Sequence, residues 1–178
     1  MVLRRVVVTG LGALTPIGNN IEEYWNGLIN GVSGAAPITY YDASKFRTHF
    51  ACEVKNFNVE DFIDRKEARK MDRYAQYALV AAEEAVQDAG FDFEKIDKDR
   101  AGVIWGSGIG GLETFQIEVL NYAAGDGTPK FNPFFIPKVL LDTAAGQIYI
   151  KYGLRGVNFA SVSACASASH GIIDAFNY

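Results

Sequence analysis

Residues 158–178 read NFASVSACASASHGIIDAFNY, and this stretch decides how the chain is interpreted. The residues before Cys165 favour a β-strand, and the residues after it follow a helical pattern. The cysteine is therefore expected at a junction between a strand and a helix. A cysteine in this position either packs as a small apolar residue or reacts.

A thiol at the start of a helix is suited to nucleophilic chemistry. The free N–H groups and the dipole of a helix N-terminus favour the thiolate, which is the reactive form. A sharp strand-to-helix turn exposes the sulfur, and its N–H groups can stabilise the oxyanion formed from a thioester carbonyl. The neighbours Ala164, Ala166, Ser167 and Ala168 are small enough for a substrate to approach. The pattern favours acyl transfer by Cys165.

The alternative is that the cysteine only packs, because free cysteines are usually small buried hydrophobes. We apply that interpretation to Cys52, in FACEV, since no helix start follows it. Two cysteines far apart do not form a disulfide framework, which favours a reducing, cytoplasmic setting.

Strands and helices are expected to alternate along the rest of the chain. Apolar runs predict strands over 5–10, 100–106 and 157–164. Asp72 is a plausible N-cap for the clearest helix, which Gly90 should end. Further helices are predicted over 21–30, 112–125 and 137–153, the first capped by Asn20, the last opened by Pro137 and ended by Gly153. This alternation indicates an α/β layered fold on a largely parallel sheet.

Composition narrows the function. The chain has 178 residues, of which 49% are hydrophobic, so it is one domain or a large part of one. A net charge of −4 argues against a general nucleic-acid binder. No apolar run approaches the ~20 residues needed to span a membrane. The two histidines are far apart and offer no spacing for metal ligands, and no cofactor is expected.

A glycine-rich loop raises a second possibility. Gly106, Gly108 and Gly111 in GSGIGG satisfy G-x-G-x-x-G, which on its own suggests a dinucleotide site. The preceding strand is the second predicted strand, however, and Asp126 lies in a loop instead of at the end of a strand. We favour the interpretation that these glycines let backbones approach closely. A nucleotide-binding oxidoreductase remains an alternative that NAD(P)H binding would reveal.

Several motifs together resemble the β-ketoacyl-acyl-carrier-protein synthases, most closely the synthase II type of fatty-acid synthesis. The resemblance covers the whole chain and rests on RVVVTGLGALTPIGN, IDRKEARKMDRYAQYALVAAEEAVQDAG, GVIWGSGIGGLETF, NPFFIPK, AAGQIYIKYGLRG and SVSACASASHGIIDAFNY. It implies a thiolase-like fold, with layers αβαβα in the complete homodimeric enzyme, and no cofactor.

The resemblance also implies roles for individual residues. Cys165 would take an acyl chain from acyl carrier protein and pass it to malonyl-carrier protein, with loss of carbon dioxide, to give a 3-oxoacyl product. The backbone N–H of Cys165 would be one oxyanion donor. Ile109 and Phe135 would line or gate the acyl pocket near the dimer interface, and an apolar slot suits a fatty chain.

A basic stretch gains a role from the same resemblance. Arg65, Lys66, Arg69 and Lys70 form two pairs at i,i+4 spacing. Such a run is usually a solvated face, but in a net-acidic protein it also suits an acidic carrier protein. The family's carrier-docking positions match Lys66, Arg69 and Lys70, with Lys130 as a weaker addition.

The chain departs from the family in places. Ala168 stands where many members have glycine, and Val157 replaces a usual proline. The family's two catalytic histidines, a lysine and a second oxyanion donor belong to its second half. His170 is not one of them, and we expect a structural or dimer-contact role for it.

We expect residues 1–178 to be an N-terminal portion that ends at Tyr178, inside the nucleophile helix, and to be inactive alone. The alternatives are a polyketide-type or synthase I ketosynthase, or a non-catalytic carrier-binding or dimerisation partner. The presence of Cys165 argues against the last.

Overall fold

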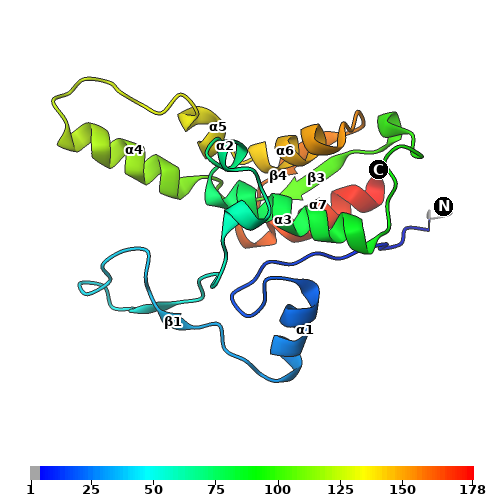
Figure 1. The fold of residues 1–178 in the computed structure, drawn as a ribbon, viewed down its shortest axis with the longest axis horizontal. Coiled ribbons are helices and arrows are strands. Elements are labelled where there is room, and N and C mark those ends of the chain that lie inside the picture. Colours follow the sequence, from blue (N-terminus) through cyan, green and yellow to red (C-terminus); the bar gives the residue numbers. More distant parts are fainter. Residues whose placement is uncertain (1–4) are drawn as a thin grey trace. The chain divides into compact units, whose positions relative to one another are not determined.

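In the computed structural model, residues 5–178 are described, and they divide into two units. The first unit comprises residues 59–79 and 92–178 together with residues 5–7, and the second comprises residues 8–58 and 80–91. Helix α3 (Arg73–Asp88) supplies residues to both. Figure 1 shows the elements.

The first unit is built on a pair of parallel strands. β3 (Val103–Gly106) pairs with β4 (Asn158–Ser161), in a register that sets Val103 opposite Asn158 and Gly106 opposite Ser161. The two strands predicted in these regions are confirmed, although each is shorter than expected. Helices α6 (Thr143–Tyr152) and α7 (Ser167–Asn177) pack on both strands. The resulting core includes Val103, Ala144, Ala145, Ile148 and Leu154.

Asp72 joins the beginnings of two helices. Its carboxylate accepts a hydrogen bond from the backbone N–H of Tyr74 at 3.2 Å, which confirms it as the cap of α3. It also accepts from the N–H and the hydroxyl of Thr114, at 3.1 and 2.5 Å, in the first turn of α4 (Leu112–Ala124). Only 6% of Asp72 is exposed, so these bonds satisfy a buried carboxylate. Gly90, at φ +62°, lies just beyond α3 as predicted.

The single helix predicted over 137–153 is wrong, because the chain forms two helices there. α5 (Phe135–Val139) stops at Leu140, whose backbone is extended at φ −64° and ψ 130°, and α6 follows from Thr143. The Thr143 hydroxyl donates to the carbonyl of Pro137 at 2.6 Å and bridges the break. Pro137 lies within the first turn of α5, where its missing N–H costs little. Gly153 ends α6 in the left-handed conformation, as predicted.

The remaining short elements of the first unit are one α-helix and three 3₁₀ turns. The α-helix is α2 (Arg65–Ala68), capped by Asp64. The 3₁₀ turns are η1 (Val59–Asp61), η2 (Lys98–Arg100) and η3 (Ala164–Ala166).

The second unit holds a long loop against the end of α3. The Glu84 carboxylate accepts from the N–H groups of Ala13 and Ile21, at 2.8 and 2.7 Å. The cap predicted for α1 (Ile21–Ile29) is confirmed, since the Asn20 side chain accepts from the N–H of Glu23. A short antiparallel pair, β1 (Ala36–Pro37) with β2 (Phe50–Ala51), completes this unit.

The strand predicted over 5–10 is wrong for the described structure. Residues 5–10 carry no strand assignment, and Val6, Val7 and Val8 are 51%, 61% and 79% exposed. A β-strand needs a neighbour to take its backbone hydrogen bonds. Within residues 5–178 no strand pairs with this run, so its apolar pattern alone does not make it a strand.

Large apolar side chains also remain exposed on α4. None of its residues is buried, and Leu112, Ile117 and Leu120 are 56%, 49% and 57% exposed. Among the described helices, none combines the length and the apolar character needed to cross a bilayer.

Candidate active site

Cys165 lies where the sequence predicted it, between a strand and a helix. β4 ends at Ser161, Cys165 is the middle residue of η3, and α7 begins at Ser167. Its side chain is exposed. We call residues 163–167 the cysteine turn. The thiol therefore lies in the short 3₁₀ turn between a strand and an α-helix, and a reagent can reach it.

The residue before the cysteine has an unusual backbone. Ala164 has φ +48°, in the left-handed region that L-residues other than Gly, Asn and Asp rarely adopt. In residues 5–178, Asn56 is the other non-glycine residue with positive φ, and asparagine tolerates this region better than alanine. For alanine the cost is about 1–2 kcal/mol. Such strain persists only where the surroundings hold it, and it gathers at functional sites.

Ser167 is the side chain that holds this turn. It is only 3% exposed. Its hydroxyl donates to the carbonyl of Ala164 at 2.7 Å and accepts from the N–H of Ser163 at 2.9 Å. The sequence pattern indicates Ser167 only as a small residue beside the cysteine. The signal that was available is a serine at a helix start, a position where serine commonly bonds backbone groups.

His170 adds a second link to the same turn. Its Nδ1 lies 2.6 Å from the hydroxyl oxygen of Ser163. This contact agrees with the structural role expected for His170. It reaches back from the first turn of α7 to the residue before the strained alanine.

Two backbone donors of the turn, the N–H groups of Ala164 and Cys165, are left available within residues 5–178. The N–H of Ala166 donates to the carbonyl of Ser163 at 2.9 Å. For the N–H of Cys165, no acceptor is found within residues 5–178. When a thiolate attacks a carbonyl, the carbonyl oxygen becomes an oxyanion, and an N–H group beside the sulfur can donate a hydrogen bond to it.

The glycines of GSGIGG lie where backbones cross closely. A Cβ on Gly106 would lie 2.3 Å from the carbonyl oxygen of Ser167, and one on Gly111 would lie 2.0 Å from that of Lys138. At Gly108 the nearest atom, the oxygen of Ala164, would be 3.6 Å away. These contacts account for Gly106 and Gly111 by packing alone. They also bring the loop after β3 next to the cysteine turn.

The two predicted acyl-pocket residues lie on different elements. Ile109 is 66% exposed on the loop after β3. Phe135 is half-buried at the start of α5, where its ring stacks on Phe131 at 5.5 Å and on Phe115 at 6.2 Å. No described contact joins Ile109 to Phe135. Their shared role therefore stays a prediction.

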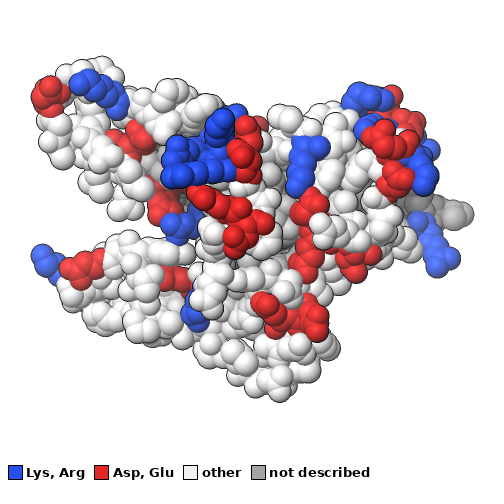
Figure 2. Space-filling model, viewed as in Figure 1, with Lys and Arg blue, Asp and Glu red and all other residues white. Residues whose placement is uncertain are grey.

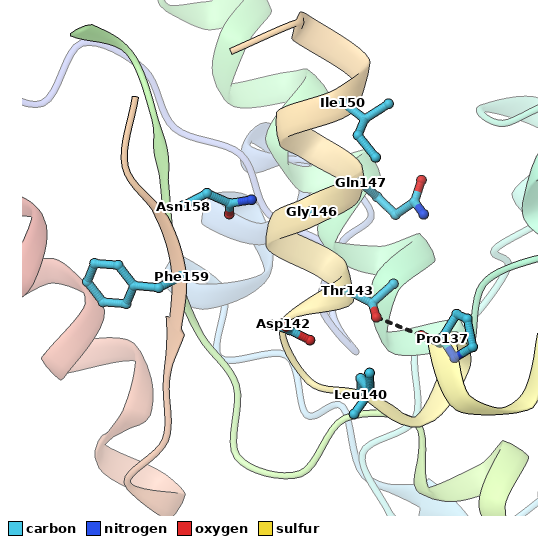
Figure 3. A pocket seen from close by; sticks show the side chains of 9 residues that line it. All are labelled: Pro137, Leu140, Asp142, Thr143, Gly146, Gln147, Ile150, Asn158 and Phe159. Carbon is cyan, nitrogen blue, oxygen red and sulfur yellow. Dashed lines mark hydrogen bonds between the residues drawn. The ribbon is translucent and has the colours of Figure 1, made fainter. Parts of the chain in front are cut away.

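A cavity of about 350 Å³ lies between α6 and β4 (Figure 3). Thr143 and Asn158 lie on opposite sides of it, and Phe159 lies at its β4 side. Its lining includes neither Cys165 nor the two predicted acyl-pocket residues. This cavity is therefore separate from the cysteine turn.

The predicted basic residues gather on and just after α2. Figure 2 shows Lys and Arg side chains clustered over this helix, with acidic groups beside them. Arg65 pairs with Glu60 at 3.2 Å, and Lys70 pairs with Glu67 at 2.6 Å. Two exposed cations, Lys66 and Arg69, have no acidic partner within residues 5–178. Lys130 is exposed on the loop between α4 and α5.

The expectation that Cys52 packs in a core is wrong. Cys52 is exposed, like Cys165, because it follows the short strand β2 at the surface of the second unit. Exposure alone therefore does not distinguish the two thiols. What distinguishes them is the strained, hydrogen-bonded turn around Cys165.

Comparison with known proteins decides the family. Residues 3–177 match the model of the β-ketoacyl synthase N-terminal domain. The chain belongs to this β-ketoacyl synthase family. It is 49% identical over 173 residues to a 3-oxoacyl-[acyl-carrier-protein] synthase 2 of Staphylococcus aureus (strain COL). The match covers 97% of this chain and 42% of that relative, so the chain spans about two fifths of its length.

Solved structures of ketosynthases share the fold. The ishigamide ketosynthase/chain length factor superposes with a TM-score of 0.84 at 28% identity, covering 99% of this chain and 45% of the other. A β-ketoacyl synthase from Burkholderia phymatum STM815 gives 0.81 at 26% identity, covering 98% and 43%. The predicted α/β, thiolase-like class is therefore confirmed, as is the resemblance to β-ketoacyl synthases.

Proposed function

We propose that this chain carries the acyl-accepting cysteine of a 3-oxoacyl-acyl-carrier-protein synthase of fatty-acid elongation. The observation that supports this most is the cysteine turn, in which an exposed Cys165 follows a left-handed alanine and precedes α7. The similarity to a 3-oxoacyl-[acyl-carrier-protein] synthase 2 supports the same reaction class.

In the proposed first step, the Cys165 thiolate attacks the carbonyl carbon of an acyl thioester. A new S–C bond forms, the carbonyl oxygen becomes an oxyanion, and the N–H of Cys165 donates to it. The oxyanion then collapses, the old S–C bond breaks, and the carrier leaves as a thiol after taking up a proton. The product is an acyl-enzyme on Cys165.

In the proposed second step, malonyl-carrier protein loses carbon dioxide and the resulting carbanion attacks the acyl-enzyme carbonyl. The bond to Cys165 breaks, and the product is 3-oxoacyl-carrier protein. The two histidines, the lysine and the second oxyanion donor implied by the family resemblance are expected in a C-terminal half. Residues 1–178 alone are therefore proposed to lack condensing activity.

The acyl and carrier sites complete the proposal. Ile109 and Phe135 are proposed to meet the acyl chain once a second copy and the C-terminal half cover the exposed apolar surface of α4. Carrier protein is proposed to dock on Lys66, Arg69 and Lys70, with Lys130 contributing. The absence of an acidic partner for Lys66 and Arg69 among the described residues supports this, since both charges are available.

The test is acyl transfer to the protein at its natural full length. Acyl-carrier protein is added, and the mass of each cysteine peptide is measured. The acyl group is expected on Cys165 in the native protein and in Cys52→Ala, which is the matched control because Cys52 is also exposed. Cys165→Ala is expected to gain no acyl group. Iodoacetamide is likewise expected to label Cys165 before Cys52.

Acylation of Cys52, or of the Cys165→Ala protein, would contradict the assignment of the nucleophile. Acylation of Cys165 without a condensation product would point to the non-catalytic partner. Product chain lengths separate the synthase II proposal from the synthase I and polyketide-type alternatives.

A further inference from the structure

We propose that Ser167 is a positioning residue for Cys165. Its hydroxyl holds Ala164 in the left-handed conformation and so fixes the cysteine's sulfur and N–H in their reactive places. This inference rests on the proposed function of Cys165 and adds a residue that acts through it.

The Ser167 hydroxyl makes two hydrogen bonds to backbone groups of the cysteine turn. One is made with the N–H of Ser163 at 2.9 Å and the other with the carbonyl of Ala164 at 2.7 Å. The N–H of Ser163 belongs to the peptide unit before residue 163, and the carbonyl of Ala164 belongs to the peptide unit after residue 164. The hydroxyl therefore spans the backbone torsions of both residues, including the φ of +48° at Ala164.

Ala164 does not favour this conformation by itself. An alanine released from its surroundings returns to negative φ, where steric repulsion is lower. That rotation would reorient the peptide between Ala164 and Cys165, which carries the available N–H of the cysteine. Holding this peptide is therefore equivalent to holding the oxyanion donor.

Ser167 is itself firmly placed. It is 3% exposed, and its carbonyl oxygen lies against Gly106 of β3. His170, three residues later on the same face of α7, contacts the Ser163 hydroxyl at 2.6 Å. The first turn of α7 therefore contacts residues 163 and 164 through the side chains of Ser167 and His170, and it packs against β3.

The experiment compares Ser167→Ala with Ser169→Ala in the full-length protein. Ser169 is exposed on the same helix and has no side-chain partner among the described residues, so it is a matched control. The readouts are the alkylation rate of Cys165 by iodoacetamide and the rate of acyl transfer. Ser167→Ala is expected to slow both by about ten- to a hundredfold. Ser169→Ala is expected to change neither by more than about twofold.

A rescue variant separates positioning from general stability. Glycine adopts the left-handed region without strain. In the double variant Ala164→Gly with Ser167→Ala, the turn no longer needs the hydroxyl to hold it. The double variant is therefore expected to recover most of the lost rate. Because glycine at position 164 also relieves the strain of the alanine, the free energy of unfolding of the three proteins is measured in urea alongside the rates. A serine that only stabilised the fold would give rates that follow the unfolding free energy, whereas a positioning serine slows Cys165 under conditions in which every variant is fully folded.

Two results would overturn the inference: unchanged rates in Ser167→Ala, or a double variant as slow as the single one. If Ser167→Ala does not fold, Ser167→Cys keeps a similar volume with a weaker hydrogen-bonding group. The rate at Cys165, read from fragment masses that separate it from the new thiol at position 167, should then be intermediate. Ala164→Gly should raise that rate, and no rise would count against positioning. Native protein that is alkylated but never acylated at Cys165 refutes the proposed function while the iodoacetamide comparison still decides the role of Ser167.

Discussion

At the scale of single residues, several charged side chains each make two hydrogen bonds and connect separate segments of the chain. Asp72 bonds to the first turns of α3 and α4, and Glu84 bonds to two N–H groups of the second unit. Asp99 and Arg155 form a two-pronged ion pair, with Nε–Oδ1 at 2.5 Å and Nη2–Oδ2 at 3.2 Å. Each of these side chains links segments far apart in the sequence, so each contributes to the fold beyond its local element.

The Asp99–Arg155 pair predicts an acid-sensitive contribution to stability. The hydrogen bond from Arg155 holds the pKa of Asp99 below its ordinary value of 3.8. The folded state therefore prefers the carboxylate. This contribution is complete above pH 3.8 and is lost as the pH falls below it through the folded pKa. Asp99→Asn is expected to flatten the pH dependence of the urea midpoint below pH 3.8, and only slightly because both groups are exposed.

Arg155→Gln should flatten the same part of the curve, since it removes the partner that lowers the pKa. Asp174→Asn is the control, because no side-chain partner is found for Asp174 among the described residues. An Asp99→Asn protein with the native acid dependence would contradict the prediction.

At the scale of elements, one close crossing in the first unit joins β3 to the start of α7. Gly106 lies against Ser167, and a Cβ on Gly171 would lie 3.3 Å from the N atom of Gly106. Both glycines lack the side chain that would separate the strand from the helix. The position of α7, and with it the cysteine turn, therefore depends on the strand beneath it.

This crossing predicts that Gly106→Ala is damaging. Its Cβ would lie 2.3 Å from the Ser167 oxygen and 2.6 Å from the Cα of Ala168, and backbone atoms do not yield easily. We expect a loss of about 1–3 kcal/mol in the free energy of unfolding. Slower alkylation of Cys165 should accompany it, because α7 must shift. Urea unfolding and iodoacetamide labelling measure the two effects.

Gly108→Ala is the matched control from the loop that follows β3. The nearest atom to its Cβ would be 3.6 Å away, which is ordinary van der Waals contact. We expect a change in unfolding free energy below about 1 kcal/mol. Equal losses in the two variants would show that the close crossing is not what makes Gly106 necessary.

At the scale of the whole molecule, the surface over α2 is basic although the chain as a whole is acidic. The chain has a net charge of −4, yet basic side chains gather over α2 (Figure 2). Ion pairs engage Arg65 and Lys70, which leaves Lys66 and Arg69 available for a partner. A small basic area on an acidic protein can orient an acidic partner while the rest of the surface repels it.

We therefore predict that Lys66→Glu with Arg69→Glu weakens binding of acyl carrier protein by about tenfold at low salt, since two favourable charges become repulsive. The difference should shrink at higher ionic strength. Lys95→Glu is the control, because Lys95 pairs with Asp92 away from α2. Titration of the full-length protein with carrier protein measures the effect, and equal affinities at low salt would exclude this docking surface.

Local sequence patterns predicted the structure correctly where it depends only on neighbouring residues. Asn20, Asp72 and Gly153 form their predicted caps because a cap depends on one side chain or one backbone conformation. The break at Leu140 is not predicted because the helical pattern runs through it, and the hydrogen bond from Thr143 to Pro137 that bridges the break is not visible in that pattern. The run over 5–10 was predicted as a strand because an apolar pattern does not reveal whether a partner strand is present.

By itself, the sequence determined the α/β class, the family and the position of Cys165 between a strand and a helix. The class and the place of Cys165 follow from apolar periodicity, a property of neighbouring residues, and the family follows from the similarity of the whole sequence to known proteins. Only the tertiary structure revealed the left-handed Ala164, the two hydrogen bonds of Ser167 and the contact of Gly106 with α7. Strain and close approach depend on which backbones meet in space, and that is decided when the strand and the helix pack together.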